Sequence, residues 1–117
     1  MKTCLVLEGG AMRGMYTAVA LDVFSNAGIQ VDGIIGGSAG AASGVNYLAR
    51  QPGRVIRYNK RFNADHQYMG LIPLLKTGNI VDTEYAYEKV PRELDPFDGD
   101  TFDASGVPFW AVVTNVE

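Results

Sequence analysis

Two short apolar runs near the start of the chain are each followed by a segment with helical spacing. Residues 3–8 and 31–36 are rich in strand-forming side chains. In residues 12–26 apolar side chains recur every three to four positions, and residues 41–50 form a second, small-residue helical segment. Strand, helix, strand and helix within about fifty residues restrict the fold to a βαβα unit with parallel strands and a right-handed crossover.

A glycine-rich turn follows each of these strands, at Gly9–Ala11 and at Gly36–Gly40. Because the strands are parallel, both turns are expected at the carboxyl ends of their strands, on one edge of the sheet. Adjacent strands lie about 4.8 Å apart. The first turn is therefore predicted to reach over the hydroxyl of Ser38 in the second.

The remaining chain contains further elements. The sequence predicts a helix over residues 54–63 and a loop or lid-like segment with a short helix over residues 64–82. A second helix, over residues 83–90, is predicted to begin at the N-cap Thr83 and to end at Pro91. A turn-rich stretch over residues 94–106 and a strand over residues 107–116 are predicted to follow. A chain of 117 residues is long enough for one domain with a modest core.

Charge argues against nucleic acid as a partner, because the net charge is −3 and no broad basic face is present. The basic residues Arg54, Arg57, Lys60 and Arg61 recur at helical spacing. They are interpreted as a solvated helix face, with contact to an anionic membrane surface as the alternative.

Cys4 is the only cysteine, and it lies in an apolar run, so it is expected to be a buried, reduced thiol of a cytoplasmic protein. One Cys and one His make a metal site improbable. Glu8 and Arg13 interrupt the first apolar run too early for a signal peptide. No stretch approaches the length of a membrane-spanning helix.

Ser38 stands between Gly36 and Gly40 in a G-x-S-x-G pattern at a strand-to-helix junction. This pattern is typical of a nucleophile elbow, in which a strained turn exposes the serine hydroxyl. Side chains two positions before and after the serine would collide across such a turn. From the pentapeptide alone, a glycine-softened turn with a serine N-cap is an equal alternative.

The two turns together resemble a known family. Residues 8–14, Glu-Gly-Gly-Ala-Met-Arg-Gly, resemble the glycine-rich oxyanion motif G-G-G-x-[RK]-G of patatin-like phospholipases. Residues 36–40 resemble the serine motif of that family, and the spacing between the motifs fits. Residues 113–117 resemble the end of the central strand in bacterial members.

The resemblance implies a three-layer α/β/α fold with a mainly parallel sheet, and a serine acyl-ester hydrolase with a Ser–Asp dyad and no cofactor. Ser38 would be the nucleophile. Backbone N–H groups of Gly9, Gly10, Ala11 and Ala39 would form the oxyanion hole. The substrate would be a lipid or another acyl ester, and peripheral contact with a membrane is expected.

Four further residues would support these motifs: Arg13, Gly14, Gly36 and Gly40. Arg13 is expected to shape the loop rather than to touch the reacting atoms. The sequence departs from the family pattern at Ala11, where the motif has its third glycine. A methyl group is tolerable there only if φ is negative.

The aspartate of the family lies in a D-G-[GA] motif downstream of any position in this sequence. Asp32-Gly33 is expected at the wrong end of its strand, and Asp98-Gly99 reads as a turn. We therefore expect residues 1–117 to be the amino-terminal portion of a single patatin-like domain, cut after its third strand. Self-association through the uncovered sheet edge would follow.

Three other interpretations remain open. Such a portion could be catalytically silent or act as a binding module. A dinucleotide-binding βαβ unit is suggested by Gly9-x-Ala11-x-x-Gly14 followed by Asp32, although its central glycine is missing. His66 could belong to a triad, but no acid is placed to orient it, and a surface histidine is the simpler interpretation.

Overall fold

The computed structural model describes residues 1–62 and 64–116. The chain divides into two compact units, one formed by residues 1–55 with 98–117 and the other by residues 56–97. The sequence-based assignment of the whole chain to one domain stays a prediction. The last residue of the helix predicted over 54–63 lies outside the described residues.

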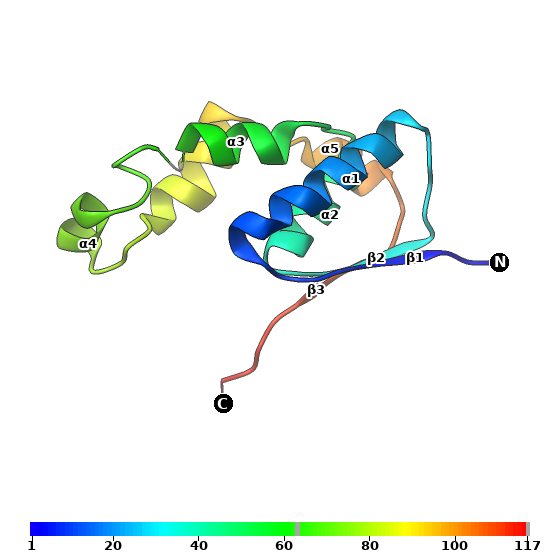
Figure 1. Cartoon of the computed structure of the whole chain (residues 1–117), viewed down its shortest axis with the longest axis horizontal. Helices are drawn as coiled ribbons and strands as arrows, with labels where there is room; N and C mark the ends of the chain where they lie inside the picture. Colours follow the sequence, from blue (N-terminus) through cyan, green and yellow to red (C-terminus); the bar gives the residue numbers. More distant parts are fainter. Residues whose placement is uncertain (63, 117) are drawn as a thin grey trace. The chain divides into compact units, whose positions relative to one another are not determined.

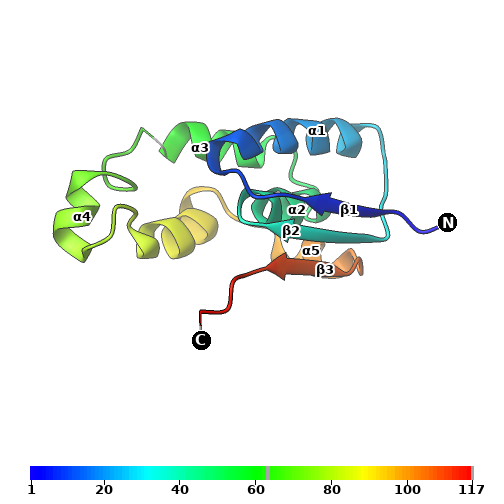
Figure 2. The same ribbon diagram turned by 60° about the horizontal axis from the view of Figure 1, so that its bottom comes forward.

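The first unit is built on a parallel sheet of three strands in the order β1-β2-β3 (Figure 2). The strands are β1 Cys4–Leu7, β2 Gly33–Gly37 and β3 Phe109–Val112. In the register, Leu7 lies opposite Gly36, and Gly36 lies opposite Ala111. The predicted α/β class and parallel pairing are confirmed, and they agree with a patatin-like α/β/α fold.

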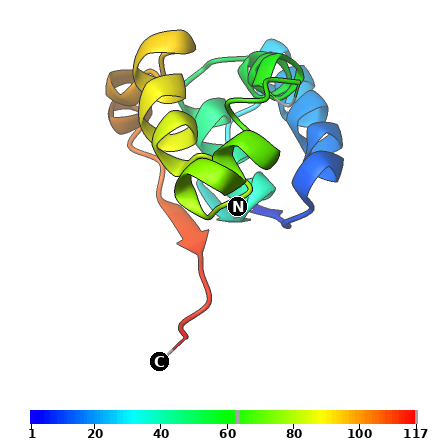
Figure 3. The same ribbon diagram turned by 90° about the vertical axis from the view of Figure 1, so that its left-hand side faces the viewer.

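The helices of this unit lie on one side of the sheet (Figures 1 and 3). They are the 3-10 turn η1 Ala11–Arg13 and the helices α1 Gly14–Asn26, α2 Ala39–Leu48 and α5 Gly99–Ala104. The core between sheet and helices contains Leu7, Leu21, Val31, Ile34 and Leu48. Ile34 is completely buried. Apolar spacing in α1 and small residues in α2 thus build the layer that the sequence predicts.

The opposite face of the sheet carries exposed apolar side chains. Val6, Trp110 and Val112 are 75%, 53% and 60% exposed. Cys4 shares this face and is also exposed, so the prediction of a buried thiol is wrong. The physical reason is the strand order: right-handed crossovers between strands that follow one another across the sheet place both connecting helices on the same face.

The second unit contains most of α3 Arg54–Phe62, together with α4 Leu71–Thr77 and the π-helix η2 Tyr85–Leu94. Its interior is aromatic: the ring centroids of Phe62, Tyr68 and Tyr85 lie 6.1 to 6.3 Å apart. A short helix inside residues 64–82 agrees with the sequence prediction.

The prediction that Pro91 ends the helix after residue 83 is wrong, because η2 continues through Pro91 to Leu94. Pro91 has no N–H to donate, and the helix continues past it through an i→i+5 bond from the Asp95 N–H to the Val90 carbonyl at 2.9 Å. The start is also corrected. Residues 83 and 84 are already helical before η2, and Asp82, not Thr83, caps this stretch, because its Oδ1 accepts from the Tyr85 N–H at 3.0 Å.

One basic residue of α3, Arg54, is buried, which corrects the interpretation of a solvated helix face for that residue, whereas Arg57, Lys60 and Arg61 are exposed. Arg54 is 4% exposed, and its Nη1 donates to Asn46 Oδ1. Arg57 makes two hydrogen bonds, of 2.9 and 2.8 Å, to the carboxylate of Asp95. These bonds raise the pKa of Arg57. Arg61 donates to the Leu94 carbonyl.

Candidate active site at the carboxyl edge of the sheet

Ser38 occupies a strained backbone conformation between β2 and α2. Its φ of 47° and ψ of −120° lie in a region that residues with a side chain rarely adopt. The serine is exposed to solvent, whereas Gly36 and Gly40 on either side of it are buried. The local geometry is therefore that of a sharp strand-to-helix turn that presents the serine at the surface.

The steric role of the two flanking glycines can be measured. A Cβ at Gly36 would lie 2.7 Å from the backbone of Ala41. A Cβ at Gly40 would lie 2.3 Å from the carbonyl oxygen of Leu7 and 2.6 Å from that of Glu8. Both clashes are with backbone atoms, so no side-chain rearrangement could relieve them. Helix α2 can start this close to β2 because position 36 is glycine, and this close to β1 because position 40 is glycine.

The glycine-rich turn after β1 lies against the serine turn. A Cβ at Gly9 would lie 3.2 Å from Ser38 Cβ, and a Cβ at Gly14 would lie 2.5 Å from Ala39 Cβ. The two motifs, which are more than twenty residues apart in sequence, are therefore in contact at the carboxyl edge of the sheet. Parallel pairing of β1 with β2 brings them together.

Backbone N–H groups are available at this edge. In residues 1–62 and 64–116, the N–H groups of Gly9, Gly10 and Ala11 donate to no protein acceptor. Ala39 is the first residue of α2, so its N–H has no partner within the helix. The positive end of the helix dipole also lies here. An anion or a developing negative charge would be stabilised beside Ser38.

Ala11 has a φ of 46°. The condition under which alanine is tolerable at the third position of the glycine motif, a negative φ, is therefore not met, and the residue is strained. Arg13 has an exposed side chain, and its backbone N–H closes the turn on the Gly10 carbonyl at 2.9 Å. Its support of the loop thus includes a main-chain contribution.

Two polar residues buried in α2 stabilise the helix that starts at Ser38, and the sequence analysis did not single them out. Ser43 and Asn46 are 2% and 5% exposed, and they donate to the carbonyls of Ala39 and Ala42. Arg54 in turn donates to Asn46 at 3.0 Å. These contacts hold the first turns of the helix that starts at the serine. Their only sequence signal is a polar residue on the buried side of an apolar helix.

The candidate acids in this unit are engaged away from Ser38. Asp32 precedes β2 and accepts from the Thr3 N–H at 2.7 Å, at the amino edge of the sheet. Asp98 caps α5 by accepting from the N–H and hydroxyl of Thr101 at 2.9 and 2.6 Å, which lowers the pKa of Asp98. In the described part of this unit, no side chain forms a hydrogen bond with the Ser38 hydroxyl.

His66 lies in the second unit, is exposed, and forms no hydrogen bond with a carboxylate in the described residues. The carboxylate of its neighbour Asp65 accepts from the Gln67 N–H and the Tyr85 hydroxyl, and these bonds lower the pKa of Asp65. A catalytic role for His66 has no support from these contacts.

Comparison with known proteins agrees with this geometry. The family model for patatin-like phospholipase matches residues 5–115, which include both glycine-rich turns, β2, β3 and all of β1 except Cys4. The chain belongs to the patatin-like phospholipase family.

A relative of this family member is an uncharacterized protein, YjjU, of Escherichia coli strain K12. The two are 30% identical over 99 residues, which cover 80% of this chain and 28% of the relative. The chain therefore spans less than a third of the length of the relative that it matches. No solved structure matches the chain.

Proposed function

We infer that this patatin-like chain carries the nucleophile and the oxyanion-binding half of a serine hydrolase that cleaves acyl esters of lipids. The single observation that supports this inference most is the contact between an exposed, strained Ser38 and a glycine-rich turn whose N–H groups have no acceptor among the residues that the structure describes. Family membership supports lipid esters as the substrate class.

In the proposed reaction the Ser38 oxygen attacks the ester carbonyl carbon, and the serine proton passes to a base. The carbonyl oxygen becomes an oxyanion, which the N–H groups of Gly10, Ala11 and Ala39 stabilise. Each such donor can contribute about 3 kcal/mol to the transition state. The alcohol then leaves with a proton, and water hydrolyses the acyl-serine to a carboxylic acid.

The proposed dyad needs a base that accepts the Ser38 proton, and neither the serine turn nor the glycine-rich turn supplies one. By resemblance to the family it is an aspartate in a D-G-[GA] motif. Asp32 and Asp98, the two Asp-Gly aspartates of this sequence, are engaged in other hydrogen bonds. We therefore propose that the chain alone hydrolyses esters slowly or not at all, and that the whole protein is active.

A fluorophosphonate probe tests the nucleophile directly. We expect labelling of the whole protein that is lost in Ser38→Ala and kept in Ser43→Ala, since Ser43 is buried and bonded to a carbonyl. A p-nitrophenyl ester assay on the chain and on the whole protein locates the base. Full hydrolysis by the 117-residue chain would place the base within it, and persistent labelling of Ser38→Ala would refute the nucleophile.

A catalytically silent binding module is the second candidate, because no side chain in the described part of the first unit bonds to the Ser38 hydroxyl. It predicts that the whole protein, too, resists the fluorophosphonate probe. Dinucleotide binding is not favoured, because Asp32 lies at the amino edge of the sheet, opposite the glycine-rich turns.

A further inference from the structure

Helix α4 exposes the face that a surface helix ordinarily buries. Leu71, Ile72, Leu74 and Leu75 are 74%, 57%, 39% and 88% exposed, while Pro73 is the buried residue of this helix. At about 100° per residue, the four exposed side chains form a continuous arc of roughly 160°. Ile80, 60% exposed, follows in the same segment.

The segment that carries this arc is closed at its base. We call residues 69–81 the α4 tip. An isolated bridge pairs Met69 with Val81, and the Gly70 N–H donates to the Ile80 carbonyl at 2.9 Å. The hydroxyl of Thr77 donates to the Pro73 carbonyl at 2.9 Å. The exposed leucines are therefore held on an ordered scaffold, not on an open chain.

Charge in the α4 tip differs from charge in the rest of the chain. The whole sequence has a net charge of −3, yet no Asp or Glu occurs between Asp65 and Asp82. Lys76 is the only Lys or Arg in this interval, and it follows the apolar arc directly. Lys76 lines the charged pocket between α4 and η2, so the exposed apolar arc itself carries no charged side chain.

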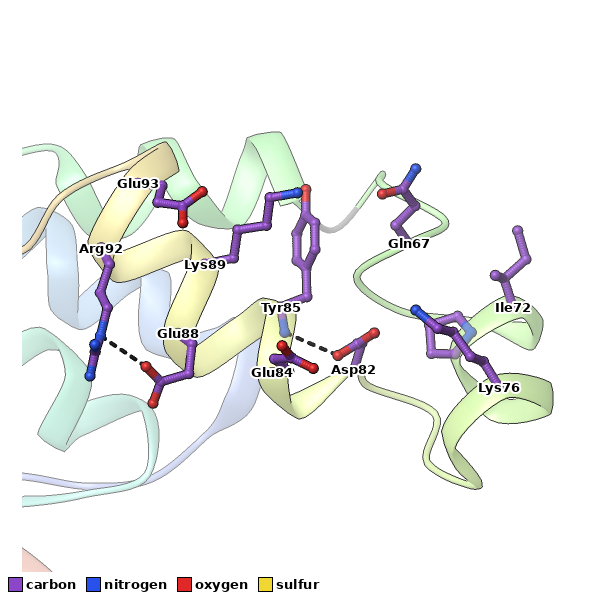
Figure 4. Close-up of a pocket in the computed structure, with 11 residues that line it drawn as sticks. Gln67, Ile72, Lys76, Asp82, Glu84, Tyr85, Glu88, Lys89, Arg92 and Glu93 are labelled. Atoms are coloured by element: carbon purple, nitrogen blue, oxygen red, sulfur yellow. Dashed lines mark hydrogen bonds and ion pairs between the residues drawn. The ribbon is translucent and has the colours of Figure 1, made fainter.

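The side of α4 next to η2 has a different character. A pocket of about 910 Å³ lies between them, and Ile72 and Lys76 line it from α4 (Figure 4). On the η2 side, Arg92 pairs with Glu88 at 2.8 Å, and Lys89 lies over the Tyr85 ring. This pocket is lined largely by charged side chains, so it offers no apolar cover for the leucines.

The size of the arc indicates what covers it. Seven helical residues span about 10 Å. Such a patch is too small for the roughly 800 Å² that each partner buries in a stable protein interface. Amphipathic elements bury a single apolar face about 5–10 Å into the boundary between head groups and acyl chains, so a bilayer surface can cover a patch of this size. In the part of the chain that the structure describes, no helix combines the length and the hydropathy that a membrane span requires.

We propose that the α4 tip inserts into the surface of a lipid bilayer and holds the chain where its ester substrates are. The proposal rests on the lipid hydrolase function inferred above, but binding to the bilayer does not require the ester to be hydrolysed. Insertion is driven by apolar side chains, so it occurs on uncharged phosphatidylcholine vesicles and persists at high salt. Adsorption through the basic residues of α3 would instead require anionic lipid and would weaken with salt.

The test uses the Ser38→Ala chain, so that hydrolysis cannot affect the readout. Cys4→Ser removes the only native thiol, and Leu75→Cys or Val23→Cys then carries an environment-sensitive fluorophore. Val23, on α1, is 58% exposed and is the matched control. With phosphatidylcholine vesicles we expect a blue shift and quenching by brominated lipid at position 75 but not at position 23.

Replacing both Leu71 and Leu75 with Asn should lower vesicle partitioning about tenfold or more, whereas Val23→Asn should leave it unchanged. Equal signals at positions 75 and 23, or none at either, would overturn the proposal. So would a blue shift at position 75 that grows with protein concentration without vesicles, which would indicate a second copy. Vesicle binding without fluorophosphonate labelling of the whole wild-type protein would instead refute the hydrolase function alone.

Discussion

Contact between Gly14 and Ala39 offers a direct test of the candidate site, because each residue belongs to one of the two motifs. In Gly14→Ala the new methyl group would lie 2.5 Å from Ala39 Cβ, about 0.9 Å closer than the 3.4 Å at which ordinary contact begins. The next atoms of Ala39 lie at 3.7 and 3.8 Å, which is acceptable. The overlap is thus confined to two methyl groups, and overpacking of this kind costs about 1–3 kcal/mol.

A second substitution should remove this cost. Ala39→Gly alone deletes a methyl group at the start of α2 and should cost at most about 1 kcal/mol. The double variant Gly14→Ala/Ala39→Gly should be no less stable than Ala39→Gly, because the overlap has gone. The coupling free energy of this double-mutant cycle should then be about 1–3 kcal/mol. This exceeds the deviation from additivity that is found for pairs of residues far apart in a structure.

Urea unfolding of the four chains, followed by circular dichroism and by the fluorescence of Trp110, the only tryptophan, would measure the cycle. The comparison requires that the free energy of unfolding fall with the same slope against urea concentration in all four chains. Strictly additive costs, or a Gly14→Ala variant as stable as the wild type, would refute the contact and with it the pairing of the two motifs.

Three further outcomes are expected. Gly40→Ala should destabilise by more than about 2 kcal/mol, because its methyl group would meet two backbone carbonyls, while Gly99→Ala, with nothing within 4 Å, should be neutral or stabilising in urea unfolding. Ser38→Gly should raise the free energy of unfolding by about 1 kcal/mol through relief of strain, and should abolish fluorophosphonate labelling. Asp98 has its pKa lowered by hydrogen bonds from Thr101, so its contribution to stability is full above the unfolded pKa of about 3.9 and is lost as pH falls through the lower folded value. In thermal unfolding between pH 6 and pH 2, the loss of stability should therefore be smaller in Asp98→Asn.

The elements that carry the site follow from local signals in the sequence. Glycine is required at positions 36 and 40 by backbone contacts, so the serine turn could be read from the residue types alone. Parallel pairing then follows from the alternation of strand and helix. The positive φ of Ala11 cannot be predicted from the alanine itself, and only the glycine that the family motif has at this position points to it.

Other features depend on contacts between distant residues. The exposure of Cys4 results from the order of the strands, and the burial of Arg54 from an amide on α2. Helix α5 was missed because Gly99–Ala104 has a polar sequence without apolar periodicity, and its cap on Asp98 reads equally well as a turn. Propensity and periodicity report local structure, so none of these three could be predicted from them.

Strand order equal to sequence order has a consequence for synthesis. β2 and β3 each pair with the strand that precedes them along the chain, so β1 and β2 can join as soon as β2 has left the ribosome. The two glycine-rich turns belong to this first-formed pair. The geometry around Ser38 can therefore be laid down early in translation, before β3 and the residues that lead to it have been made.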